Sequence, residues 1–175
     1  MQISKSLIFG FFLFAFSCKG QKPNTEALIL NPKFNRKISA MLNFSIPFIG
    51  VKELEKNQDK VIILDAREKE EFDIGHIKGA KYLGYNNFNK ETLSSIPKDA
   101  KIVVYCSIGY RSEKMGTRLK KMGYSNVQNL YGSIFEWVNQ GNPIYDSNEK
   151  RSHRIHTYNK DWSKWVDNCK CEKVW

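Results

Sequence analysis

The sequence has little histidine, no basic block interleaved with aromatic residues, and no internal repeat or low-complexity segment. Its formal net charge is +10, from 28 lysine and arginine residues against 18 aspartate and glutamate residues. The lysines are scattered, which is typical of a solvated surface, so nucleic acid is not an expected partner. With 175 residues, of which 41% are hydrophobic, the chain can bury one ordinary core, and we expect a single folded domain.

The N-terminus carries an apolar run that is too short to cross a bilayer. Lys5 precedes the run at residues 7–16, whereas a membrane-spanning helix takes about 20 residues, so we interpret the segment as a targeting signal. Small residues stand at both ends of the stretch AFS, residues 15–17, and Cys18 follows directly. This arrangement resembles the lipobox of bacterial lipoproteins, although Phe16 is bulkier than the usual residue there.

The lipobox resemblance implies a location as well as a modification. Residues 1–17 would be a signal peptide, and Cys18 would become a lipid-carrying N-terminus. We therefore expect a cell-envelope protein on the periplasmic or outer face, which touches the membrane only through its N-terminal lipid. The alternative is plain secretory cleavage before Cys18 and a secreted soluble protein.

After the targeting signal, the chain predicts a tether followed by short helices. Residues 19–25 are polar and include glycine and proline, which is typical of a linker. Residues 33–42 place apolar side chains at helical spacing, and residues 51–57 form a second helical stretch. We expect residues 18–43 to be the tether with its N-terminal helix.

Two apolar runs predict strands that are buried on both faces. They are VIILDA at 61–66 and KIVVYC at 101–106, and shorter strand candidates lie at 81–83 and 127–130. Helical stretches lie between these strands at 68–73, 91–93 and 112–122, and a last one follows them at 134–140. Alternating strands and helices predict an α/β three-layer sandwich, with a mainly parallel central sheet and helices on both faces.

A cysteine stands where the second of these strands ends. Ligands of open α/β sheets bind beyond the carboxyl ends of the strands, and Cys106 is placed there. Ser112 is a suitable N-cap for the next helix, Gly109 permits a loop whose amides face one point, and Arg111 adds a full charge. All three features favour a thiolate, so we expect a Cys106 pKa below that of a free cysteine. The alternative is an inert cysteine of the buried core.

Three ordered stretches between residues 62 and 143 resemble a rhodanese homology domain. They are LDAREKEEFDIGHIKGA at 64–80, YCSIGYRS at 105–112 and GYSNVQNLYGSIFEW at 123–137. One departure is Ser133, where the family usually has a second glycine, and this residue could shift the turn near the site. We therefore expect a rhodanese-like domain over residues 44–146.

The resemblance implies sulfur transfer without a cofactor or a metal. Cys106 would be the catalytic nucleophile and carry a persulfide, and Arg111 would attract an anionic donor such as thiosulfate and stabilise the leaving group. The expected partners are this small donor and a thiol acceptor. The loop residues expected to bind substrate are Ser107, Ile108, Gly109, Tyr110 and Ser112.

Two other functions remain open at this point. Phosphatases and arsenate reductases that resemble this fold use a C-x5-R loop, whereas Cys106 to Arg111 is C-x4-R, a tighter loop that suits a single sulfur atom. The other alternative is a non-catalytic module that binds sulfur anions or a protein partner. The presence of Cys106, Gly109 and Arg111 in one loop favours the enzyme.

Three polar residues of the first motif invite a catalytic interpretation, but a structural one is better. Asp65 and Arg67 are expected to form an ion pair that ties a strand end to neighbouring loops. No titratable group adjoins His76, and the core segment has no other histidine, so no Cys–His dyad can be assigned.

The tail at 147–175 follows the three motifs and is rich in aromatic residues. Tyr158, Trp162 and Trp165 predict that it packs on the domain. Its metal-ligating residues are His153, His156, Cys169 and Cys171, but their spacing is unusual for a zinc site. A Cys169–Cys171 disulfide suits an oxidising compartment better, and the pair could instead act as a resolving pair for the Cys106 persulfide.

Overall fold

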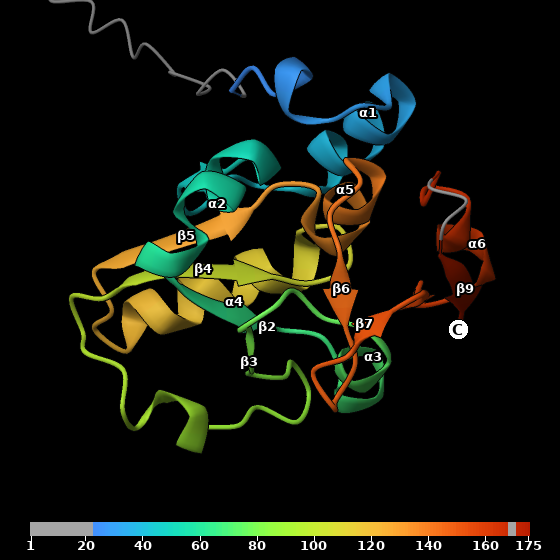
Figure 1. The fold of residues 1–175 in the computed structure, drawn as a ribbon. Coiled ribbons are helices and arrows are strands. Elements are labelled where there is room, and N and C mark those ends of the chain that lie inside the picture. The colour runs from blue at the N-terminus through green and yellow to red at the C-terminus, as the bar shows by residue number, and fades with distance from the viewer. Residues whose placement is uncertain (1–22, 168–170) are drawn as a thin grey trace, which may run out of the picture.

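A five-stranded parallel sheet forms the centre of the computed structural model, which describes residues 23–167 and 171–175 (Figure 1). The strand order is β1-β5-β4-β2-β3. The strands are β1 (Phe48–Ile49), β2 (Ile62–Asp65), β3 (Lys81–Tyr82), β4 (Lys101–Tyr105) and β5 (Asn126–Leu130). The four predicted strands are confirmed, whereas β1 was missed because two residues show no periodicity.

Helices cover both faces of this sheet. They are α1 (Pro32–Met41), α2 (Val51–Asn57), α3 (Lys69–Ile74), α4 (Tyr110–Lys121) and α5 (Ser133–Asn139), with short 3-10 turns η1 (Glu26–Leu28), η2 (Gln58–Lys60) and η3 (Glu91–Leu93). Figure 1 shows α1, α2 and α5 on one face and α4 on the other. The predicted three-layer α/β fold is therefore confirmed.

Alternation along the paired strands builds a core on each face. Ile63 of β2 lies opposite Val103 of β4, and both belong to the core shared with α1, α2 and α5. The next pair, Leu64 and Val104, belongs to the core shared with α4. Because both faces are buried, these strands are apolar throughout rather than alternating.

The N-terminal helix α1 is held firmly against the domain. Asn31 caps it by accepting hydrogen bonds from the amides of Lys33 and Phe34. Phe34 and Ile38 are fully buried in the core beneath α1. The chain after α1 is fixed by Glu113 of α4, whose carboxylate accepts hydrogen bonds from two backbone amides at residues 43 and 45.

The tail also packs on the domain. Its elements, with the strand that precedes them, are β6 (Ile144–Tyr145), β7 (Arg151–Ser152), β8 (Arg154–His156), α6 (Lys160–Ser163) and β9 (Glu172–Val174). Strand β8 pairs in parallel with β9, and Ile155 and Val166 are completely buried. The ring of Trp165 stacks on Phe34 of α1 with 5.5 Å between the centroids. The tail and the N-terminal helix therefore contact each other directly.

Several predictions concern residues outside the described part of the chain. The signal peptide and Cys18 lie in residues 1–22, and Cys169 of the predicted disulfide lies in residues 168–170. Within residues 23–167 and 171–175, no helix has the length and apolar character that a membrane crossing requires.

Candidate active site

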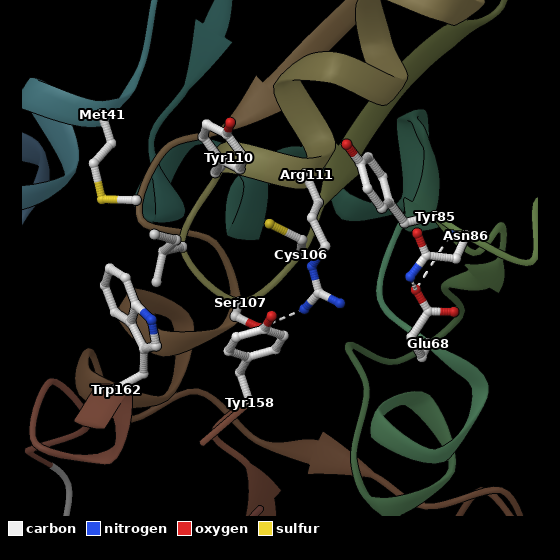
Figure 2. Close-up of a pocket in the computed structure, with 11 residues that line it drawn as sticks. Met41, Glu68, Tyr85, Asn86, Cys106, Ser107, Tyr110, Arg111, Tyr158 and Trp162 are labelled. Atoms are coloured by element: carbon white, nitrogen blue, oxygen red, sulfur yellow. Dashed lines mark hydrogen bonds between the residues drawn. The ribbon is translucent and has the colours of Figure 1, made fainter. Parts of the chain in front are cut away.

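Cys106 lies directly after β4, at the carboxyl end of the sheet, and opens onto a cavity of about 420 Å³ (Figure 2). The residue as a whole is only 1% exposed, so the thiol lies at the bottom of this cavity. The lining residues are Met41, Glu68, Tyr85, Asn86, Cys106, Ser107, Ile108, Tyr110, Arg111, Tyr158 and Trp162. The structure thus places four of the other six predicted catalytic and binding residues beside Cys106 on one cavity, and the remaining two, Gly109 and Ser112, lie against its sulfur.

The helix after Cys106 begins closer to the cysteine than the sequence predicted. Gly109 has a φ of 113°, and its amide donates a hydrogen bond to Cys106 Sγ at 3.2 Å. A side chain at that φ would be strained, so glycine is needed for the turn. Helix α4 begins at Tyr110, immediately after Gly109. The prediction that Ser112 is the N-cap is therefore wrong, because the left-handed glycine starts the helix before it.

Ser112 contributes to the site from the first turn of α4 instead. Its hydroxyl lies 3.5 Å from Cys106 Sγ and 2.7 Å from Asn129 Oδ1. Asn129 on β5 in turn donates a hydrogen bond to the carbonyl of Gly109 at 2.9 Å. The single hydroxyl hydrogen of Ser112 can serve only one of its two acceptors at a time. Ser112 therefore links the thiol to the neighbouring strand.

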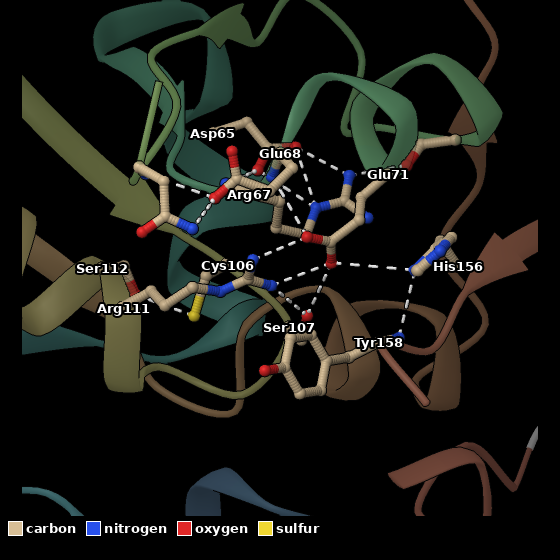
Figure 3. A network of polar contacts seen from close by, with 12 residues as sticks. Asp65, Arg67, Glu68, Glu71, Cys106, Ser107, Arg111, Ser112, His156 and Tyr158 are labelled. Carbon is tan, nitrogen blue, oxygen red and sulfur yellow. Dashed lines mark hydrogen bonds and ion pairs between the residues drawn. The ribbon is translucent and has the colours of Figure 1, made fainter. Parts of the chain in front are cut away.

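Arg111 is bound by a carboxylate that the sequence did not single out. Its two terminal nitrogens donate to the two carboxylate oxygens of Glu71 at 2.6 and 2.8 Å, and one of them also donates to Ser107 Oγ at 2.9 Å (Figure 3). Burial alone raises the pKa of Glu71, but the hydrogen bonds and charges of Arg111 and Arg67 outweigh it and lower this pKa to about 2. Glu71 is thus ionised at neutral pH and holds Arg111 in place.

The environment of Cys106 favours the thiolate. Burial raises its pKa, but the charge of Arg111 and hydrogen bonds from Ser112 and Gly109 act in the opposite direction and prevail. The pKa of Cys106 consequently lies below its ordinary value, as the sequence predicted. A thiol whose surroundings favour ionisation, placed in a cavity, is suited to nucleophilic attack on a small molecule.

The remaining polar residues of the first motif are structural. Arg67 Nη2 contacts Asp65 Oδ2 at 2.7 Å and the carbonyl of Gly75 at 2.7 Å, and both ionic side chains are fully buried. The ring of His76 stacks on Phe72 with 3.9 Å between the centroids. None of these side chains lines the cavity, so the predicted structural interpretation agrees with their positions.

The tail takes part in the cavity wall, which the sequence did not predict. The Arg111 guanidinium lies over the ring of Tyr158 at 5.3 Å, and Trp162 lines the same cavity. His156 Nδ1 lies 3.8 Å from Glu71 Oε1, on the side away from the thiol (Figure 3). Among the described residues, no group of three or more histidine, cysteine or acidic side chains is placed to hold a metal.

The family of the chain follows from comparison with known proteins. The profile of the rhodanese-like domain family matches residues 50–140, just over half of the chain. The chain belongs to the rhodanese-like domain family. The match includes Cys106, Arg111 and Glu71, whereas Met41, Tyr158 and Trp162 lie outside it.

Two curated relatives each match less than half of the chain. The probable adenylyltransferase/sulfurtransferase MoeZ of Mycobacterium tuberculosis is 36% identical over 85 residues, which cover 48% of this chain and 22% of that protein. The tRNA uridine(34) hydroxylase of Listeria monocytogenes is 41% identical over 85 residues, covering 43% and 25%. The chain thus spans about a quarter of the length of these relatives.

Solved structures agree with the rhodanese-like fold. A rhodanese-related protein from Thermoplasma volcanium has a TM-score of 0.52 at 25% identity, and the match covers 57% of this chain and 97% of that one. Thiosulfate sulfurtransferase from Pseudomonas aeruginosa has a TM-score of 0.55 at 19% identity, covering 76% and 25%. The second likeness shows the fold alone.

Ser133 is where this chain departs from the usual rhodanese glycine. Its φ is 51°, a left-handed conformation that costs a serine more than a glycine. Its hydroxyl accepts a hydrogen bond from the Cys106 amide at 3.1 Å and donates to the Leu130 carbonyl at 3.1 Å. The serine hydroxyl therefore ties the backbone of the cysteine to β5.

Proposed function

We propose that this protein is a rhodanese-type sulfurtransferase that moves sulfane sulfur from an anionic donor such as thiosulfate to a thiol acceptor. The observation that supports this most directly is the position of the Cys106 thiol at the bottom of the cavity, where its sulfur accepts a hydrogen bond from the Gly109 amide at 3.2 Å. The lowered pKa of Cys106 favours the nucleophilic thiolate. Membership of the rhodanese-like family supports sulfur transfer as the reaction.

In the first step of this proposal, the Cys106 thiolate attacks the outer sulfur of thiosulfate. A sulfur–sulfur bond to Cys106 forms, the bond inside thiosulfate breaks, and sulfite leaves with the electron pair. In the second step, an acceptor thiolate attacks the outer sulfur of the Cys106 persulfide. The Cys106 thiolate is then the leaving group, and the product is the persulfide of the acceptor.

Arg111 supports both steps with a positive charge that Glu71 holds in place. Its guanidinium lowers the pKa of Cys106, which favours the thiolate as nucleophile in the first step and as leaving group in the second. Glu71 occupies two of its donors, so the donor anion meets a charge that is already partly neutralised. The loop amides then carry a larger share of anion binding.

The location of this activity is part of the same proposal. The lipobox-like stretch before Cys18 supports a lipid-anchored protein of the cell envelope, with secretion of a soluble form as the alternative. Radiolabelled fatty acid that is incorporated into the native protein but not into Cys18→Ser would support the anchor. Equal incorporation into both proteins would overturn it.

Intact-mass spectrometry after incubation with thiosulfate tests the sulfur-transfer step. We expect the native protein to gain the mass of one sulfur atom and Cys106→Ser to gain none. The adduct should disappear when a thiol is added, with the acceptor persulfide as product. A native protein that gains no sulfur from thiosulfate, mercaptopyruvate or polysulfide would overturn the proposal in favour of a binding module.

A further inference from the structure

The outer wall of the Cys106 cavity is built by segments that flank the family-matched region. Met41 ends helix α1, and Tyr158 and Trp162 belong to the tail, whereas the family match covers residues 50–140. Figure 2 shows Met41 and Trp162 together on one side of Cys106, opposite Glu68 and Asn86. Two extensions of this chain thus complete a cavity whose bottom belongs to the rhodanese-like domain.

Contacts between the two extensions hold this wall in position. Phe34 of α1 stacks on Trp165, Lys37 Nζ lies 6.0 Å from the centroid of the Trp162 ring, and Asn31 donates to Asp167 Oδ2 at 3.1 Å. These contacts span more than a hundred residues of sequence and come from a helix whose inner face is fully buried. The wall is therefore a packed part of the fold.

The extensions are also tied to the family domain beneath them. The Leu30 amide donates to Glu136 Oε1 of α5 at 2.9 Å, and Tyr131 OH donates to Asn35 Oδ1 at 2.7 Å. On the tail side, Asn139 of α5 donates to the backbone carbonyl of Trp165 at 2.9 Å. The same helix α5 thus supports both extensions.

The chemistry of this wall is aromatic and apolar. Rings of Tyr85, Tyr110, Tyr158 and Trp162 surround the way to the thiol, together with the side chains of Met41 and Ile108. Two charged side chains also line the cavity. Arg111 is bound by Glu71, and Glu68 accepts from Asn86 at 3.0 Å through Oε1, while its Oε2 is buried without a hydrogen-bond partner. A bound molecule would therefore meet ring faces more readily than a free charge.

We propose that helix α1 and the tail select the sulfur acceptor, and that this acceptor is a small thiol with an aromatic or apolar substituent. The inference rests on the sulfurtransferase function proposed above and names its acceptor class. Ring faces gain from stacking with an aromatic or apolar substituent, whereas a hydrophilic substituent would lose hydration and gain less from these faces. Tyr158 and Trp162 are the specificity-determining residues of this wall.

Transfer from preloaded protein to two thiols of closely similar pKa tests this acceptor class. Full-length protein carrying the Cys106 persulfide is mixed with benzyl mercaptan or 2-mercaptoethanol, and loss of the persulfide is followed by intact mass. We expect the native protein to react about tenfold faster with benzyl mercaptan. Tyr158→Ala and Trp162→Leu should each reduce this ratio about three- to tenfold.

The control for this experiment is another aromatic residue of the same tail. Trp175 is 59% exposed and does not line the cavity, so Trp175→Ala should keep the native ratio. Tyr158 is 55% exposed, and alanine retains its left-handed backbone strain, so Tyr158→Ala is expected to fold. A native ratio near one, or a ratio that both wall variants leave unchanged, would overturn the acceptor class.

A second measurement separates this inference from the sulfurtransferase function itself. Iodoacetanilide and iodoacetamide alkylate thiols by the same chemistry and differ by a phenyl ring, so their rate ratio at the Cys106 peptide reports on the wall without any persulfide. We expect the phenyl reagent to be favoured in native protein and less so in Tyr158→Ala. If this holds while no sulfur is loaded, the proposed function fails but the wall keeps its aromatic selectivity. If sulfur is loaded but neither ratio responds, the acceptor inference fails alone.

Discussion

Arg67 and Arg111 are two arginines of one small region that form similar ion pairs in different surroundings. Arg67 binds Asp65 through Nε and Nη2, and both side chains are fully buried. Arg111 binds Glu71 through two terminal nitrogens, but 13% of its side chain is exposed at the cavity. Both pairs have the geometry of strong guanidinium–carboxylate interactions.

The difference lies in what else each guanidinium contacts. Arg67 donates to the carbonyl of Gly75 and lies 5.7 Å from the centroid of the Tyr105 ring, so its charge is used inside the fold. Arg111 donates to Ser107 and lowers the pKa of Cys106, so its charge acts on a reactive group. An ion pair of this kind is therefore functional or structural according to its neighbours rather than its own geometry.

The largest effect is expected from breaking the fully buried pair. Arg67→Met leaves the Asp65 carboxylate buried without its partner, which typically costs about 3–5 kcal/mol of unfolding free energy. Urea unfolding followed by circular dichroism would measure this loss. Arg111→Met should cost less, because the Arg111 side chain is already 13% exposed and Glu71 keeps its hydrogen bonds from Ser107 and from the Glu68 amide.

The control for this prediction is the double variant Asp65→Asn with Arg67→Met. It removes the buried charge along with its partner and should recover part of the lost stability. Equal losses in Arg67→Met and Arg111→Met would erase the distinction between a structural and a functional pair.

A smaller and oppositely signed pair of effects is expected at the functional site. Arg111→Met removes the positive charge beside the thiolate, so the Cys106 pKa should rise. Glu71→Gln removes a negative charge and leaves the charge of Arg111 less neutralised, so the same pKa should fall, by less than it rises in Arg111→Met. The pH dependence of Cys106 alkylation, read on its peptide, measures both shifts.

The control is Arg154→Met, which removes a positive charge from an exposed side chain that does not line the cavity and should leave the alkylation profile nearly unchanged. Shifts of the same sign in Arg111→Met and Glu71→Gln would contradict the view that Glu71 moderates the charge of Arg111. They would indicate instead that the two substitutions act through a common disturbance of the loop.

Much of the fold could be predicted because the spacing of apolar residues along the chain indicates most of its strands and helices. Strands β2 and β4 are continuous apolar runs since both of their faces are covered, and the helices between strands show their own spacing. The two-residue strands β1 and β3 depend on neighbouring strands for their definition, so their existence or bounds were poorly indicated. The tail strands β8 and β9 lie after the family-matched residues 50–140, and their three residues each show no apolar run or alternation that would indicate a strand.

The site could be predicted only where it is contiguous in sequence. Cys106, Gly109 and Arg111 share one short loop, whereas Glu71 stands forty residues away and reaches Arg111 only through the fold. Its place in the first motif was the one available signal. The N-cap error at Ser112 arose because propensity favours serine there, while the left-handed Gly109 decides where the helix starts. The aromatic tail predicted packing but not that its rings would face the thiol.

The smallest effect is expected at Ser133, where a neutral hydrogen bond rather than a charge fixes the cysteine backbone. Ser133→Ala leaves the Cys106 amide without its partner and keeps the left-handed strain, so it should lower the unfolding free energy by about 1–3 kcal/mol. Ser133→Gly loses the same bond but relieves about 1 kcal/mol of strain, and should lie between Ala and the native protein. Urea unfolding measures both, and the difference between them isolates the backbone strain.

Because neither variant alters a charge near the sulfur, the alkylation profile of Cys106 should move far less than in Arg111→Met. A shift as large as that one would mean that the position of the cysteine backbone, and not the charge of Arg111, controls the thiol.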